Sequence, residues 1–143
     1  MALQPGIPTY ARVFGWILAI AGVFFAYVYT INPGGFFPGV SITSYSEHFG
    51  LYSTGVRILG AVLGILVALI LDSAALFAAV LVTRIFIELG DVVVGLVINH
   101  GTPDTNTATL LGLAAIEVFF AVKLTQVVLH SSRQQAGRVV KIS

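Results

Sequence analysis

Residues 73–99 read SAALFAAVLVTRIFIELGDVVVGLVIN, an apolar stretch that is interrupted near its middle by three charged residues. The stretch is longer than the ~20 residues that a helix needs to cross the hydrocarbon core of a bilayer. Arg84, Glu88 and Asp91 are separated by four and then three positions, which places them within roughly 60° of one another around a helix. A charged side chain at bilayer depth costs at least ~2.5–3.5 kcal/mol on insertion scales. We therefore expect this polar stripe to face the interior of a helical bundle or a wet cavity.

The composition of the whole chain predicts an integral membrane protein. Of its 143 residues, 57% are hydrophobic and 9% are charged, and the mean hydropathy is +0.99. Soluble domains carry about 25% charged residues. A formal net charge of +1 gives no electrostatic footprint for nucleic acid, and the lack of cysteine excludes disulfides and thiolate metal sites. The sequence thus predicts one transmembrane domain over residues 1–143, surrounded by lipid, without nucleic acid, metal or cofactor.

Hydropathy divides the chain into four expected membrane-spanning helices, at about 12–31, 54–71, 73–99 and 107–130. The first segment is longer than the apolar part of a signal peptide, and no small-residue cleavage site follows it, so we expect it to be retained. Short connections at 72–73 and 100–106 favour antiparallel neighbours. The predicted fold is therefore all-α: an antiparallel up-down four-helix transmembrane bundle with an outer loop at about 32–52.

The distribution of basic residues predicts the orientation of this bundle. Basic residues lie before the first expected span and after the fourth: Arg12, Arg133, Arg138 and Lys141. The loops at 32–52 and 100–106 contain no Lys or Arg. Because cytoplasmic loops carry the excess of Lys and Arg, both termini are expected in the cytoplasm. Lys123, about two turns before the inner end of the fourth span, is interpreted as an interfacial anchor.

Five charged residues on three of the expected helices fall at similar depths: Arg57, Arg84, Glu88, Asp91 and Glu117. Counting ~1.5 Å per residue from the cytoplasmic helix ends puts all five within a layer about 11 Å thick. Two arginines then oppose three carboxyl groups, which leaves one carboxyl group in excess.

This charged layer permits three interpretations. It can be an ion-pair network that fixes the register of the helices. It can instead be a catalytic or binding site for a lipophilic molecule, in which Glu88, Asp91 or Glu117 acts as a carboxylic acid in an apolar environment. It can also carry protons in a small transporter. No motif of a known catalytic type decides between these possibilities, so enzymatic activity stays open.

The second expected helix contains a G-x-x-x-G pair, Gly60 and Gly64, of the kind that lets transmembrane helices approach closely. Arg57 lies three residues before Gly60 and shares that packing face. We expect Arg57 to pair inside the bundle; outward snorkelling of its side chain is the alternative.

The outer loop at 32–52 combines turn-forming and aromatic residues. Ser53 or Thr54 is expected to cap the helix that follows it. The loop is long for a connection, so Tyr45, His48 and Tyr52 are candidates for a lid or a docking surface. The alternative is an interfacial segment whose aromatic rings lie among the lipid head groups.

The four-span size and the run Thr54-Gly55-Val56-Arg57-Ile58-Leu59-Gly60 resemble the small, largely uncharacterised bacterial four-helix membrane proteins of the DoxX-like type. The resemblance covers the second and third spans. It implies the four-helix fold and a location in the bacterial inner membrane, but no reaction. The aromatic loop and the dense charges of the third span depart from that type, so no functional residue is carried over.

These observations lead to three functional hypotheses. The first is an accessory or assembly subunit of a larger membrane complex, with other membrane proteins as partners and the charged layer fixing helix packing. The second is a small membrane enzyme or binding protein for a lipophilic molecule. The third is a small proton-coupled transporter.

Overall fold

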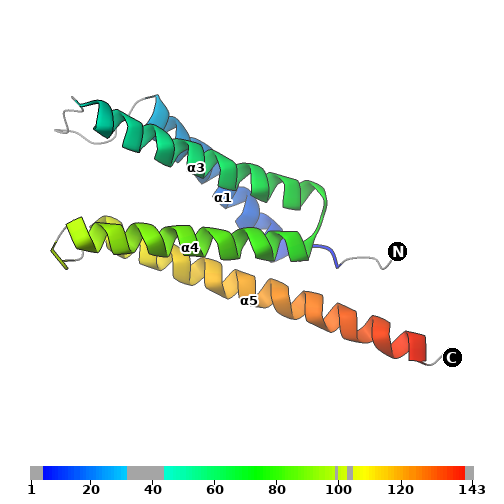
Figure 1. Ribbon diagram of the computed structural model, residues 1–143. Helices are drawn as coiled ribbons and strands as arrows, with labels where there is room; N and C mark the ends of the chain where they lie inside the picture. The colour runs from blue at the N-terminus through cyan, green and yellow to red at the C-terminus, as the bar shows by residue number, and fades with distance from the viewer. Residues whose placement is uncertain (1–4, 32–43, 99, 103–104, 141–143) are drawn as a thin grey trace.

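The computed structural model describes residues 5–31, 44–98, 100–102 and 105–140. Within these residues the chain is all-helical, with four helices: α1 (Thr9–Thr30), α3 (Tyr45–Ile70), α4 (Ala74–Ile98) and α5 (Thr105–Val140) (Figure 1). By length and composition α1, α3 and α5 are apolar enough to cross a membrane. Helix α4 is also long and apolar, but it carries the three charged residues of the stripe.

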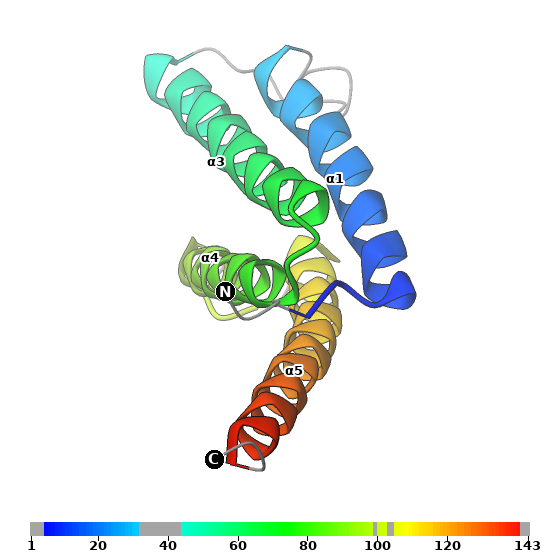
Figure 2. The same ribbon diagram turned by 90° about the vertical axis from the view of Figure 1, so that its right-hand side faces the viewer.

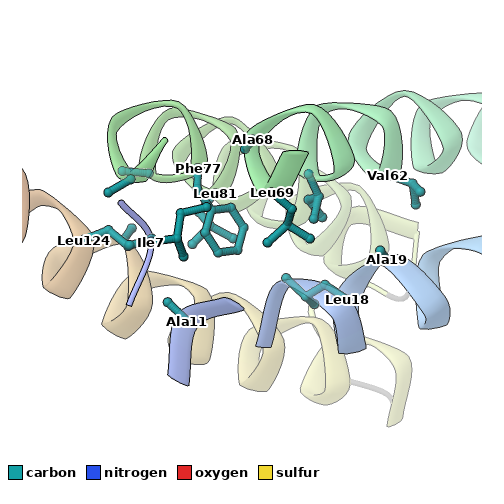
Figure 3. Packing of buried hydrophobic residues seen from close by; sticks show 14 residues of the cluster. Ile7, Ala11, Leu18, Ala19, Val62, Ala68, Leu69, Phe77, Leu81 and Leu124 are labelled. Carbon is teal, nitrogen blue, oxygen red and sulfur yellow. The ribbon is translucent and has the colours of Figure 1, made fainter. Parts of the chain in front are cut away.

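The helices pack as two pairs, α1 with α3 and α4 with α5, and a short turn at 71–73 joins the pairs (Figures 1 and 2). The buried apolar core lies close to this turn. Ala68 and Leu69 of α3, Phe77 of α4 and Leu124 of α5 meet there, together with Ile7 from the segment before α1 (Figure 3). The four helices are therefore held together most firmly at the end of the molecule where α1 begins.

Helix α3 begins at Tyr45, nine residues before the predicted start of the second span at 54. Ser44 is its N-cap: the Ser44 hydroxyl accepts a hydrogen bond from the Glu47 N–H at 3.2 Å, and Glu47 accepts one from the Ser44 N–H at 2.9 Å. This capping box satisfies two backbone donors that the helix start would otherwise leave free. The predicted cap at Ser53 or Thr54 is wrong, since both hydroxyls donate to the Gly50 carbonyl oxygen within the helix.

The predicted outer loop at 32–52 is correspondingly wrong over its second half. Residues 45–52 form the first two turns of α3, and 32–43 lie outside the described residues. Because α3 begins at Tyr45, Arg57 lies near the middle of this helix. Its side chain therefore starts about 18 Å from the helix end at Tyr45, at ~1.5 Å per residue.

The turn between the helix pairs holds the segment that precedes α1. Asp72 adopts the left-handed conformation, with φ at 48°, as its short polar side chain permits. Its carboxylate accepts hydrogen bonds from the Ile7 N–H at 2.8 Å and from Arg12 at 2.6 Å. The Ala74 N–H donates to the Pro5 carbonyl oxygen at 3.2 Å. The sequence predicts a tight turn here, but not these contacts with the start of the chain.

Close packing between α1 and α3 depends on small residues of α1 and on Gly55 of α3 rather than on the G-x-x-x-G pair. Gly15, Ala19 and Gly22 are all buried on the face of α1 that meets α3. A Cβ added to Gly22 would collide with Val62, whereas a Cβ added to Gly60 would meet nothing within 4 Å. Gly60 therefore lies on a face of α3 that the described residues leave open.

Candidate functional site

The centre of the charged layer is a triad of Arg84 and Glu88 on α4 and Glu117 on α5. Arg84 Nε donates to Glu117 Oε1 at 2.7 Å, and Arg84 Nη2 donates to Glu88 Oε1 at 2.8 Å. The Glu117 side chain is fully buried, and those of Glu88 and Arg84 are 8% and 13% exposed. One guanidinium group thus joins two carboxyl groups from neighbouring helices inside the protein.

The local sequence explains why these three side chains meet. Arg84 and Glu88 are one helical turn apart on α4, so both point to the same neighbour. On α5, the small residues Ala114 and Ala121 are buried one turn on either side of Glu117. These alanines leave room for α4 to approach closely, which places the Glu117 carboxyl group within reach of Arg84.

Each carboxyl group of the triad has one oxygen that Arg84 does not reach. Glu88 Oε2 and Glu117 Oε2 are both buried, and neither accepts a hydrogen bond from an N–H or hydroxyl donor among the described residues. The carboxyl group in excess over the arginines therefore belongs to this triad. Chemically, the arrangement can retain one proton, which would make the triad electrically neutral in its apolar surroundings.

The other two residues of the layer form a separate and more exposed pair. Arg57 Nη1 donates to Asp91 Oδ1 at 3.3 Å, and Arg57 Nη2 donates to the Thr54 hydroxyl at 3.3 Å. Their side chains are 47% and 36% exposed. The expected pairing of Arg57 thus occurs, but at the outside of the helix bundle rather than in its interior.

A groove of about 360 Å³ runs between α3 and α4 beside this pair. Most of its lining residues are small side chains of both helices, and two arginines also line it: Arg57, Gly60, Ala61, Gly64, Ala79, Val80, Thr83, Arg84 and Ile87. The G-x-x-x-G face of α3 therefore lines a groove. None of the three candidate catalytic carboxyl groups, on Glu88, Asp91 and Glu117, lines it, so a molecule in the groove would meet arginine side chains instead of a carboxylic acid.

The candidates from the predicted outer loop lie on the first two turns of α3. Tyr45 is 84% exposed, and its ring stacks on that of Phe49 with centroids 6.3 Å apart. The His48 ring lies 6.2 Å from the Tyr52 ring, and His48 Nδ1 is 3.0 Å from the Ser44 carbonyl oxygen. These side chains form an aromatic group at the beginning of α3 and do not contact the residues of the charged layer.

Sequence reasoning did not identify Thr54 as a partner of Arg57, nor Asp72 as the acceptor for Ile7 and Arg12. The i, i+3 spacing of Thr54 and Arg57 could have indicated the first contact. The contacts of Asp72 with Ile7 and Arg12 join segments that are sixty or more residues apart, so no local sequence pattern predicts them.

Among the described residues, no group of three His, Asp or Glu side chains is placed to hold a metal ion. Comparisons with protein-family models, with curated proteins and with solved structures gave no match.

Proposed function

We propose that this protein is an accessory or assembly subunit of a larger integral membrane complex. In this proposal all four helices cross a bacterial inner membrane as an antiparallel up-down bundle, with both termini in the cytoplasm. The apolar character of α1, α3 and α5 supports insertion. Helix α4 can join them because its charged side chains pair with those of α3 and α5, which removes much of the cost of placing them in lipid.

The observation that carries this proposal is the Arg57–Asp91 pair at the edge of an open, small-residue groove. Both side chains are more than a third exposed at a depth where lipid tails would surround them. Lipid tails offer no hydrogen-bonding groups, so a half-exposed ion pair is costly there unless another polar group covers it.

A helix from another subunit fits this groove in both shape and chemistry. Gly60, Ala61 and Gly64 of α3 and Ala79 of α4 allow a close backbone approach. A hydrogen-bond acceptor on the partner helix would bond to the N–H groups that Arg57 has left over. The groove is less suited to acid catalysis, because no carboxyl group lines it.

A pair of glycine-to-leucine variants tests the proposal. An added Cβ meets nothing within 4 Å at either Gly60, in the groove, or Gly112, on α5. Gly60→Leu and Gly112→Leu should therefore both leave the stability of the isolated protein unchanged. Purified from its native membrane in mild detergent, the Gly112→Leu protein should retain the same membrane subunits as the wild type. The Gly60→Leu protein should lose them, because leucine fills the groove.

Two results would contradict the proposal. One is a wild-type protein that leaves the native membrane without any companion. The other is an identical set of companions for both variants, since the groove would then play no part in assembly.

A further inference from the structure

Besides the groove, a hollow of about 490 Å³ lies between the beginning of α1 and the second half of α5, away from the charged layer. Its polar wall is formed by Tyr10, Lys123, Gln126, His130, Ser131 and Gln134. Leu124 is the last residue of α5 in the buried core, and α5 continues from there past the ends of the other helices (Figure 1). The hollow therefore sits where α5 leaves the bundle.

The chemistry of this hollow suits an anion. Every one of its polar side chains can donate a hydrogen bond, and no carboxylate is among them. Asp72, the acidic residue near the start of α1, already accepts hydrogen bonds from Ile7 and Arg12. The positive charge of Lys123 is thus not neutralised by an ion pair among the described residues.

Aromatic rings position the two side chains that flank the hollow. The Tyr10 ring lies 6.1 Å from the Phe120 ring, which couples the start of α1 to α5. Lys123 Nζ lies 5.8 Å from the centre of the Phe119 ring, within the range of a cation–π contact. Tyrosine and lysine side chains that combine an apolar body with a polar tip are typical of the membrane–water interface.

We infer that this hollow binds the phosphate group of an anionic phospholipid in the cytoplasmic leaflet. The inference rests on the membrane orientation in the proposed function. The lysine ammonium group attracts the phosphate, and the tyrosine hydroxyl and glutamine amides donate to its oxygens. The acyl chains extend along the exposed apolar side chains of α1 and α5, such as Val13 and Ile116. Basic hollows between helices on the cytoplasmic side are suited to such head groups.

Nanodiscs of defined composition test this inference. The full-length protein is reconstituted in phosphatidylcholine alone and in phosphatidylcholine with phosphatidylglycerol, and retained lipid is counted by native mass spectrometry. We expect selective retention of phosphatidylglycerol and a higher Tm in its presence. Lys123→Gln should weaken phosphatidylglycerol binding about tenfold, because one charge-assisted contact is lost. His130→Leu removes another hydrogen-bond donor from the wall of the hollow and should also weaken phosphatidylglycerol binding.

The matched control is Arg133→Gln, which removes a positive charge from the same part of α5 without altering the wall of the hollow. It should retain phosphatidylglycerol as the wild type does. Equal losses in Lys123→Gln and Arg133→Gln would overturn the inference, because they would indicate diffuse surface attraction. Inorganic phosphate that reproduces the Tm shift in phosphatidylcholine nanodiscs would also overturn it, in favour of a soluble ligand.

The failure of this inference is separable from the failure of the proposed function. Nanodiscs contain no partner subunit, so lipid retention is independent of the Gly60→Leu result. A reversed orientation would leave lipid binding in nanodiscs intact and would change only the leaflet.

Discussion

At the scale of single residues, the two arginines of the charged layer differ in their surroundings and therefore in their expected importance. Arg84 is nearly buried and joins two carboxyl groups, whereas Arg57 is half-exposed and has one carboxylate partner. Breaking an enclosed ion pair leaves a charge that nothing compensates, whereas a charged group at the surface of the helices can reach the head groups or local water by snorkelling.

We predict that Arg84→Met lowers the free energy of unfolding by about 3–5 kcal/mol, since Glu88 and Glu117 are left buried without a counter-charge. The matched Arg57→Met change should cost less than Arg84→Met, because Asp91 lies at the surface of the helices, where snorkelling and local water defects can solvate it. Thermal and denaturant unfolding of both variants in the same detergent provides the measurement. An Arg84→Met protein as stable as Arg57→Met would mean that water reaches the triad.

The charge balance of the triad gives a second, linked prediction. With two carboxyl groups for one guanidinium group, Glu117→Gln alone keeps an oxygen that can accept from Arg84, and we expect a loss within about 1.5 kcal/mol. Glu88→Gln combined with Glu117→Gln should approach the loss of Arg84→Met, because the guanidinium group is then buried without any anion. The same unfolding experiments decide this; additive small losses in the double variant would show that the triad does not act as one ionic unit.

At the level of helices, hydropathy was sufficient to locate the four helices but not the start of α3 or the end of α5, which continues to Val140, ten residues past the predicted span. The apolar pattern begins near 54, whereas the helix starts at Tyr45 because Ser44 and Glu47 form a capping box. The S-x-x-E spacing of Ser44 and Glu47 can be recognised in the sequence. However, a polar stretch follows it, and hydropathy assigns that stretch to a loop.

The matching levels of the charged residues along the helices were predictable, but their pairing was not. Residue counting brought all five charged residues to one layer, yet it could not show that Glu117 would meet Arg84 and that Asp91 would meet Arg57. Those pairings depend on how the helices rotate and approach one another. The small residues that set this approach, such as Gly64 on α3 and Ala121 on α5, carry no chemical signal of their own.

Gly22→Ala tests the close approach of α1 to α3. The added methyl group collides with Val62, so we predict a loss of about 1–3 kcal/mol in stability from overpacking. Gly60→Ala is the control: it adds the same group to a helix interior with open space around it and should not be destabilising. Combining Gly22→Ala with Val62→Ala should recover part of the loss in Tm. Equal Tm values for Gly22→Ala and Gly60→Ala would contradict the packing described between these helices.

For the molecule as a whole, the number of membrane crossings in the proposed arrangement depends on α4. Helices α1, α3 and α5 are apolar enough to insert on their own, whereas α4 brings Arg84, Glu88 and Asp91 with it. If α4 crosses, its charged groups are compensated by Arg57 on α3 and Glu117 on α5, and the chain has four spans. If α4 stays out, the chain has three spans and its termini lie on opposite sides.

Reporter fusions distinguish these two arrangements. We predict that a reporter after Ser143 and one inserted at the 71–73 turn both report the cytoplasm, because the basic residues flank the first and last helices. A reporter within 100–106 should report the opposite side, since α4 then separates it from the turn. Matching signals from the turn and from 100–106 would show that α4 does not cross and would exclude the four-span bundle. Under the four-span arrangement, Arg84→Met should weaken the insertion of α4 and shift part of the 100–106 signal to the cytoplasmic side, because Glu88 loses its partner on the same helix.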